Sequence, residues 1–151
     1  MRGARGFTLI EMTVVIAVVA IAMGVVVPMI DAGITAREVR RAARQIAATM
    51  HHLRTEAVSQ GAPVAMQIDV DQNSIETVGG GRWAVLTERA VIEDVAAEEV
   101  ERGRFRIRFF PNGSNTGAAV VLASRDDRTR NRLRVDLDPL LGSIRVGDAP
   151  L

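Results

Sequence analysis

The feature that most constrains this chain is an apolar stretch near its start, FTLIEMTVVIAVVAIAMGVVVPMI, residues 7–30. Glu11 is the only ionisable residue in this stretch. A helix of this length rises about 36 Å, and the hydrocarbon core of a bilayer is roughly 30 Å thick. Helices inside a soluble domain of this size are seldom apolar on every side for so long. The pattern predicts a transmembrane helix over residues 7–30.

Basic residues precede the stretch and predict its orientation. Arg2 and Arg5 lie just before it, and cationic residues beside a span favour the cytoplasmic side. We expect a single-pass inner-membrane protein with a cytoplasmic N-terminus and a periplasmic remainder. A cleaved secretory signal is the alternative, but the stretch is too long and no small-x-small site follows it.

The leader MRGARG ends in Gly6 immediately before Phe7. Together with Glu11 and Pro28, it resembles the class III signal of type IV pilins and type II secretion pseudopilins. The resemblance implies that a membrane prepilin peptidase removes residues 1–6 by cutting between Gly6 and Phe7. The same enzyme would then methylate the new N-terminus of Phe7.

Glu11 has a physical role under this resemblance. A carboxylate in the hydrocarbon region costs a few kcal/mol, so such groups usually have a partner. Cleavage would create an amine at Phe7, four residues earlier on the same helix face. We expect Glu11 to pair with that amine, locally in a free subunit and across subunits in a filament, where attraction at low dielectric is strong. The alternative is an unpaired carboxylate that reaches the membrane edge.

Pro28 removes a backbone hydrogen bond and is expected to kink the helix; the alternative is that the helix ends there. A kink is favoured because helical periodicity resumes over residues 31–60, with an apolar stripe predicted to pack on the chain's own sheet: Val39, Ala43, Ile46, Met50, Leu53 and Ala57. We assign the remaining helix surface to Arg37, Arg40, Arg41, Arg44, His51 and Arg54. Gln60-Gly61-Ala62-Pro63 predicts the end of the helix.

Residues 61–151 have the alternation and turn residues of short strands. Phe105, Ile107 and Phe109, for example, alternate with arginines. The predicted fold class is α+β: a long N-terminal helix, its first half transmembrane, packed on a small antiparallel β-sheet or sandwich head. No linker indicates a second domain.

Two C-terminal segments, FFPNGSNTGAAVVL and LRVDLDPLLGSIRV, resemble the end of the minor pseudopilin H (GspH) family and of FimT-type minor pilins. The Phe-Pro-Asn-Gly turn is one residue tighter than the family pattern, and Leu-Leu-Gly stands where Thr-Gly is commoner. The resemblance implies a minor pseudopilin near the tip of a type II secretion pseudopilus. Implied partners are other minor and major pseudopilins, the prepilin peptidase, the inner-membrane assembly platform and secreted exoproteins.

The alternative function is a FimT-type minor pilin of a type IV pilus that binds DNA during uptake. It would use the basic segment RDDRTRNRLR, because arginine clusters bind phosphates. The segment lacks interleaved aromatic residues, so we favour a charged hairpin tip. Its candidate DNA-binding residues are Arg125, Arg128, Arg130, Arg132 and Arg134.

Two other charged patterns have structural interpretations. The acidic run over residues 93–101 is interpreted as a solvated loop, with a cation site as the alternative. Arg104, Arg106 and Arg108 share one strand face and would repel one another unless acids lie opposite. We expect acidic neighbours in the head or on another subunit.

The sequence gives little support to an enzyme. It has no cysteine, which excludes disulfides, thiolate metal sites and a cysteine nucleophile. Gly79-Gly80-Gly81 lacks the lysine and helix of a phosphate-binding loop. We therefore expect no catalytic residue, no cofactor and no metal ligand set.

Overall fold

The computed structural model describes residues 8–78, 83–86, 88–125 and 131–149 of the 151-residue chain. Within these ranges, only the backbone is described for residues 25, 27–33 and 83–85. The chain divides into two compact units, Met1–Ile34 and Thr35–Leu151. Gly6, Phe7, Arg128 and Arg130 lie outside the described residues.

A single helix, α1, runs from Leu9 to Gln60. Its end is confirmed at the predicted place: Gly61 follows with a φ of 65°, a left-handed conformation that glycine adopts without steric cost. The helix continues across Pro28, so the interpretation in which the helix ends at Pro28 is wrong. The kink at Pro28 stays a prediction.

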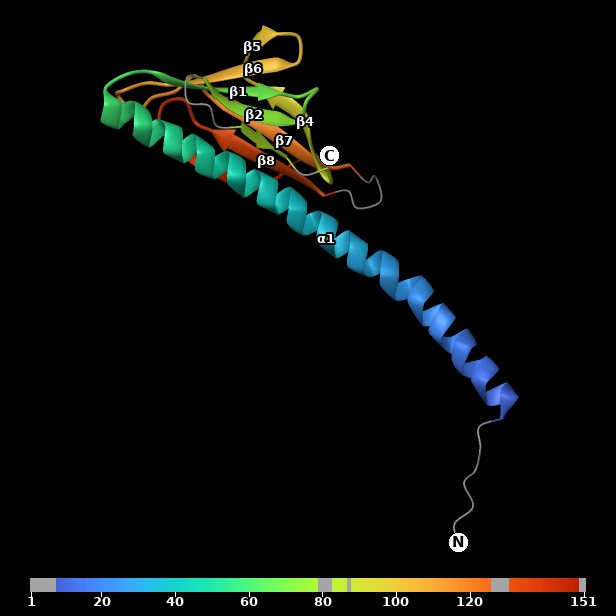
Figure 1. The fold of residues 1–151 in the computed structure, drawn as a ribbon. Helices are drawn as coiled ribbons and strands as arrows, with labels where there is room; N and C mark the ends of the chain where they lie inside the picture. Colours follow the sequence, from blue (N-terminus) through green and yellow to red (C-terminus); the bar gives the residue numbers. More distant parts are fainter. Residues whose placement is uncertain (1–7, 79–82, 87, 126–130, 150–151) are drawn as a thin grey trace. The chain divides into compact units, whose positions relative to one another are not determined.

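The second unit contains two antiparallel sheets, as predicted (Figure 1). The five-stranded sheet has the order β3-β2-β1-β6-β5, and the four-stranded sheet has the order β4-β7-β8-β9. Their bounds are β1 Val64–Asp69, β2 Ser74–Val78, β3 Trp83–Val85, β4 Ala90–Ala96, β5 Glu98–Glu101, β6 Arg104–Phe109, β7 Ala118–Ser124, β8 Arg132–Leu137 and β9 Ile144–Asp148.

One hydrophobic core joins the helix to both sheets. The helical stripe predicted from the sequence, Val39 to Ala57 at steps of four and three, is almost completely buried. Met66 and Ile107 from the five-stranded sheet and Val120 and Val135 from the other are also fully buried. The prediction that this stripe packs on the chain's own sheet is confirmed.

The acidic run over residues 93–101 is not a solvated loop, and that interpretation is wrong. Residues 90–96 form β4 and residues 98–101 form β5. A bulge between Ile92 and Asp94 shifts the register of β4 on β7, which breaks the period of two that marks a strand in sequence. In β5 all four residues are exposed, so this edge strand carries no apolar alternation at all.

Asn73 fastens the β1–β2 turn of one sheet to β4 of the other. Its Nδ2 donates to the Ala90 carbonyl at 2.7 Å, and its Oδ1 accepts from the Ile92 N–H at 2.9 Å. Its φ of 50° is left-handed, a conformation that asparagine tolerates better than most residues. The two contacts occupy backbone groups on β4, and Asn73 is therefore a joint between the sheets.

The helical pattern predicts Arg54 on the helix surface, but the structure places it against two loops of the head. Its Nε donates to the Gly113 carbonyl at 3.1 Å, and its Nη1 donates to the Gly142 carbonyl at 3.3 Å. Its Nη2 donates to the Leu141 carbonyl at 3.4 Å. Arg54 is half-buried and links α1 to the loops that precede β7 and β9.

Candidate assembly site

The first turn of α1 is built from a Thr-x-x-Glu pattern, Thr8 to Glu11. The Thr8 hydroxyl accepts a hydrogen bond from the Glu11 N–H at 3.3 Å, and the Thr8 carbonyl accepts from the same N–H at 3.1 Å. This is the N-cap arrangement in which a glutamate three residues later also favours the helix start. This second role of Glu11 was not predicted above, although the Thr-x-x-Glu pattern indicates it.

The described part of the helix after Glu11 presents largely exposed apolar side chains. Leu9 is 84% exposed, Ile16 68% and Ile21 71%. Nearly every described large side chain from Leu9 to Val26 is an exposed aliphatic or methionine. Soluble monomers rarely expose a contiguous apolar patch of this extent, so this surface requires a covering partner.

Among the described residues, no helix is both long and apolar enough to cross a membrane.

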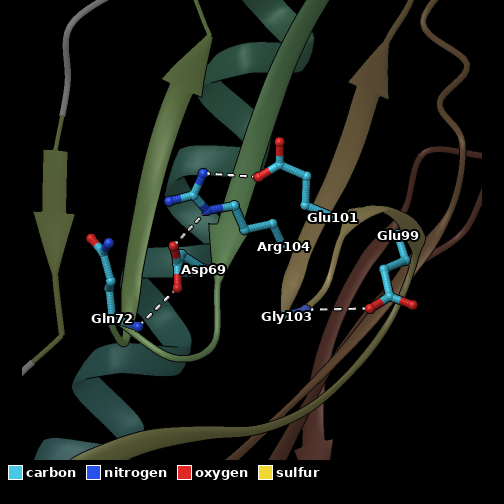
Figure 2. Close-up of polar contacts among 6 residues, drawn as sticks. All are labelled: Asp69, Gln72, Glu99, Glu101, Gly103 and Arg104. Atoms are coloured by element: carbon cyan, nitrogen blue, oxygen red, sulfur yellow. Dashed lines mark hydrogen bonds and ion pairs between the residues drawn. The ribbon is translucent and has the colours of Figure 1, made fainter.

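The outer face of the five-stranded sheet carries charged side chains, and Arg104 begins β6, next to the edge strand β5 (Figure 2). Its Nε donates to Asp69 Oδ2 at 2.8 Å and its Nη1 to Glu101 Oε2 at 3.1 Å. On the same strand Arg108 pairs with Glu98 at 3.0 Å. The expected acidic neighbours are thus confirmed within the head for Arg104 and Arg108. They are not confirmed for Arg106, whose buried Nε has no hydrogen-bond partner among the described residues.

The neighbours of Asp69 explain its protonation behaviour. The Gln72 N–H donates to Asp69 Oδ1 at 2.8 Å, and this bond, together with that from Arg104, holds the pKa of Asp69 below its ordinary value of 3.8. The hydrogen bond between Arg104 and Asp69 also raises the pKa of Arg104. Both groups stay charged under physiological conditions, and the pair fixes the β1–β2 turn against β6.

A tight turn follows β5 and supports this face. The Gly103 N–H donates to Glu99 Oε1 at 3.3 Å (Figure 2). Gly103 has a φ of 76°, and a Cβ there would lie 2.9 Å from Asp71 Oδ2. Glycine is therefore required where the chain reverses from β5 into β6.

The basic segment follows β7 and runs into β8, and these two strands pair antiparallel. Residues 126–130 lie outside the described set, and they include Arg128 and Arg130. Arg132 pairs with Glu93 at 2.7 Å and Arg134 with Asp136 at 2.6 Å, while Arg125 is exposed. Two of the five candidate DNA-binding arginines are therefore already neutralised by acids of the same chain.

No group of three or more histidine, aspartate or glutamate side chains is placed to hold a metal ion in the described part of the chain. His51 and His52 are exposed on α1. The Nε2 of His52 lies 3.8 Å from Glu56 Oε2, one helical turn away.

Comparison with known proteins identifies a family for the head and a sequence motif for the N-terminal segment. The family described as type II transport protein GspH matches residues 42–140, and the prokaryotic N-terminal methylation motif matches residues 1–27. The chain belongs to the GspH family. The type II secretion system protein H of Xanthomonas campestris is 32% identical to it over 148 residues, which cover 97% of this chain and 85% of the relative. The resemblance deduced from the leader and the C-terminal strands is confirmed.

Solved structures show that the chain shares the GspH family's fold. The minor pseudopilin EpsH from the type II secretion system of Vibrio cholerae superimposes with a TM-score of 0.60 at 17% identity, over 74% of this chain and 97% of that one. The type IV minor pilin FimU of Pseudomonas aeruginosa gives a TM-score of 0.52 at 17% identity, over 76% of this chain and 90% of that one. The predicted pilin-like α+β architecture is confirmed.

Proposed function

We propose that this chain is a minor pseudopilin that joins a type II secretion pseudopilus through its N-terminal helix and supports protein export. The observation that carries the proposal is that a GspH head and an N-terminal methylation motif occur in one chain. The relative of 32% identity, a type II secretion system protein H, supports the same function.

In this proposal residues 7–30 anchor the chain in the inner membrane and the head is periplasmic. The exposed apolar side chains from Leu9 to Met23 support it, because lipid or neighbouring helices would cover them. Phe7, Val25 and residues 27–30 complete the apolar stretch and lie partly or wholly outside the described set. Insertion holds the free subunit in the membrane, and helix packing in the filament replaces lipid contacts.

Assembly begins with processing between Gly6 and Phe7 by the prepilin peptidase. The new amine of one subunit then pairs with Glu11 of a neighbour in the filament. The inner-membrane assembly platform and the other pseudopilins are the partners, and the head contacts minor subunits near the tip and exported proteins. The covalent changes in this scheme are the cleavage and the N-methylation.

A FimT-type role in DNA uptake is the second candidate, and the head supports it less. The ion pairs of Arg132 and Arg134 reduce the free positive charge of the β7–β8 hairpin. DNA affinity depends mainly on unneutralised cations that displace counterions from phosphate.

The N-terminus of the mature protein tests the proposal. The full chain is produced with its prepilin peptidase and purified from membranes, and its mass and N-terminal sequence are determined. We expect residues 1–6 to be absent and Phe7 to carry one methyl group. Replacement of Gly6 by a larger residue should leave the leader attached. A mature chain that begins beyond residue 25, or normal processing of the Gly6 variant, would contradict the proposal.

A further inference from the structure

The first turns of α1 in the second unit carry a strip of arginines, which we call the basic band: Arg37, Arg40, Arg41 and Arg44. Their spacing of i, i+3, i+4 and i+7 places them on one helix face. All four are exposed, whereas Val39, Ala43 and Ile46 on the opposite face are fully buried.

The basic band is not neutralised within the described part of the chain. The ion pairs of the head involve Arg104, Arg108, Arg132 and Arg134. Within the band, the one side-chain hydrogen bond runs from Arg44 Nε to the Arg40 carbonyl at 3.3 Å. Four adjacent like charges repel one another, so the band favours an anionic partner.

Among the described residues, a second copy of this head does not offer a matching acidic strip. The most acidic strand, β5, already gives Glu98 to Arg108 and Glu101 to Arg104. Glu99 Oε1 accepts the hydrogen bond of the Gly103 N–H. The cations of the band are thus unpaired while the clustered acids of the chain are largely engaged.

The band also follows the apolar stretch closely in sequence. Arg37 comes seven residues after Ile30, and Arg44 comes fourteen residues after it. An anionic membrane surface attracts basic residues that follow a membrane-spanning segment closely, and salt weakens this attraction. In the proposed topology these arginines are on the translocated side, where cations beside a span are unfavourable for orientation. A binding role there compensates for that disadvantage.

We propose that the basic band binds the phosphate groups of anionic lipids at the periplasmic surface of the inner membrane before the subunit enters the filament. This inference rests on the proposed function, because it needs residues 7–30 to be inserted. The contact between the arginines and the lipid phosphates holds the base of the head at the membrane before assembly. This contact breaks when the subunit is extracted into the filament.

The test uses the full-length chain in vesicles of phosphatidylcholine with or without phosphatidylglycerol. The chain has no cysteine, so an Ala48→Cys substitution places one environment-sensitive fluorophore on the exposed face of α1, one turn after Arg44. We expect a blue shift of its emission when phosphatidylglycerol is present, and loss of that shift at high salt. The variant Arg37→Gln/Arg40→Gln/Arg44→Gln should lose the shift.

The matched control removes the same charge elsewhere on the head. Arg102, Arg125 and Arg145 are exposed, and their replacement by glutamine should leave the lipid-dependent shift intact. Equal shifts in the band variant and the wild type would overturn the inference. So would equal emission of the wild type in both vesicles.

Two further measurements separate the alternatives. Flotation with phosphatidylcholine vesicles tests insertion by itself: a chain that does not float refutes the membrane anchor, and the inference falls with it. A chain that floats without a phosphatidylglycerol response refutes the inference alone. A gel shift with duplex DNA that depends on the band, in the absence of the lipid response, would assign these arginines to nucleic acid instead.

Discussion

The guanidinium of Arg54 lies against Gly142, donating to its carbonyl oxygen at 3.3 Å. Gly142 has a φ of 62°, and a Cβ built there would lie 2.7 Å from Arg54 Cζ. The glycine thus provides both a left-handed turn and the space that the arginine occupies. This contact ties the end of the β8–β9 connection to α1.

Replacement of Gly142 by alanine should lower the free energy of unfolding by about 1–3 kcal/mol. The alanine would be strained at this φ and would displace the Arg54 guanidinium from three carbonyl groups. Chemical denaturation of the full chain in detergent, followed by the fluorescence of Trp83, measures the change. Gly147→Ala is the matched control, since a Cβ there meets no atom within 4 Å, and we expect a change within about 0.5 kcal/mol. Equal effects at the two glycines would contradict the role given to Arg54.

The two side-chain hydrogen bonds of Asn73 to β4 lead to a second prediction. Asn73→Asp keeps the oxygen that accepts from the Ile92 N–H but removes the amide that donates to the Ala90 carbonyl. A carboxylate would instead face that carbonyl, and we expect a loss of about 1–3 kcal/mol in unfolding free energy. Asn112→Asp is the same chemical change at an exposed side chain whose oxygen only accepts, from the Ser114 N–H and hydroxyl. That variant should unfold like the wild type, and a comparable loss there would show that charge alone explains the effect.

Acid should destabilise the head through two carboxylates with lowered pKa values. Hydrogen bonds from the N–H groups of Leu141 and Leu140 hold the pKa of Asp138 below 3.8, as the Gln72 N–H and Arg104 do for Asp69. A group with a depressed folded-state pKa stabilises the fold above its unfolded pKa, and that contribution is lost as pH falls through the folded pKa. The unfolding free energy should therefore fall below about pH 4.

Denaturation curves at several pH values check this expectation. Asp69→Asn/Asp138→Asn should be less stable than the wild type at neutral pH and show a shallower decline in acid. Asp148→Asn, an exposed change on β9, should retain the wild-type slope. A double variant with an unchanged slope would mean that other groups dominate acid unfolding.

The parts of the fold that are visible in sequence are those with an unbroken period. The helical stripe from Val39 to Ala57 and the alternation of Phe105, Ile107 and Phe109 each mark a face that is apolar over several turns or residues. The structure buries those faces. The leader and the apolar stretch likewise indicated an N-terminal methylation motif, because their residues are adjacent in the chain.

The parts that the sequence did not reveal depend on interrupted patterns or distant contacts. β4 is divided by its bulge, and β5 is an acidic edge strand, a composition that is depleted in strands generally. Arg54 contacts carbonyls 59 and 88 residues away, and nothing near Arg54 in the sequence distinguishes it from the exposed arginines of the basic band. Arg54 differs from those arginines only in the fold, where the carbonyls of Gly113 and Gly142 accept its hydrogen bonds.

Glu11 gives the sharpest test of assembly, because two roles fall on one side chain. As the third residue after the Thr8 cap it favours the helix start, and as a carboxylate it would pair with a neighbour's amine. Glutamine preserves the first role, since Thr-x-x-Gln is also a capping pattern, but it cannot carry the charge. We therefore expect Glu11→Gln and Glu11→Leu to be processed and inserted normally and both to be missing from sheared filaments.

Thr8→Ala provides the opposite change. It removes the hydroxyl that accepts from the Glu11 N–H, at a cost of about 1 kcal/mol in helix stability, and leaves the carboxylate in place. This variant should still enter filaments, with cleavage of the leader verified by mass. If Glu11→Gln assembled normally while Thr8→Ala and Glu11→Leu did not, the glutamate would act through the helix cap, because Thr8→Ala removes the cap and leaves the carboxylate in place.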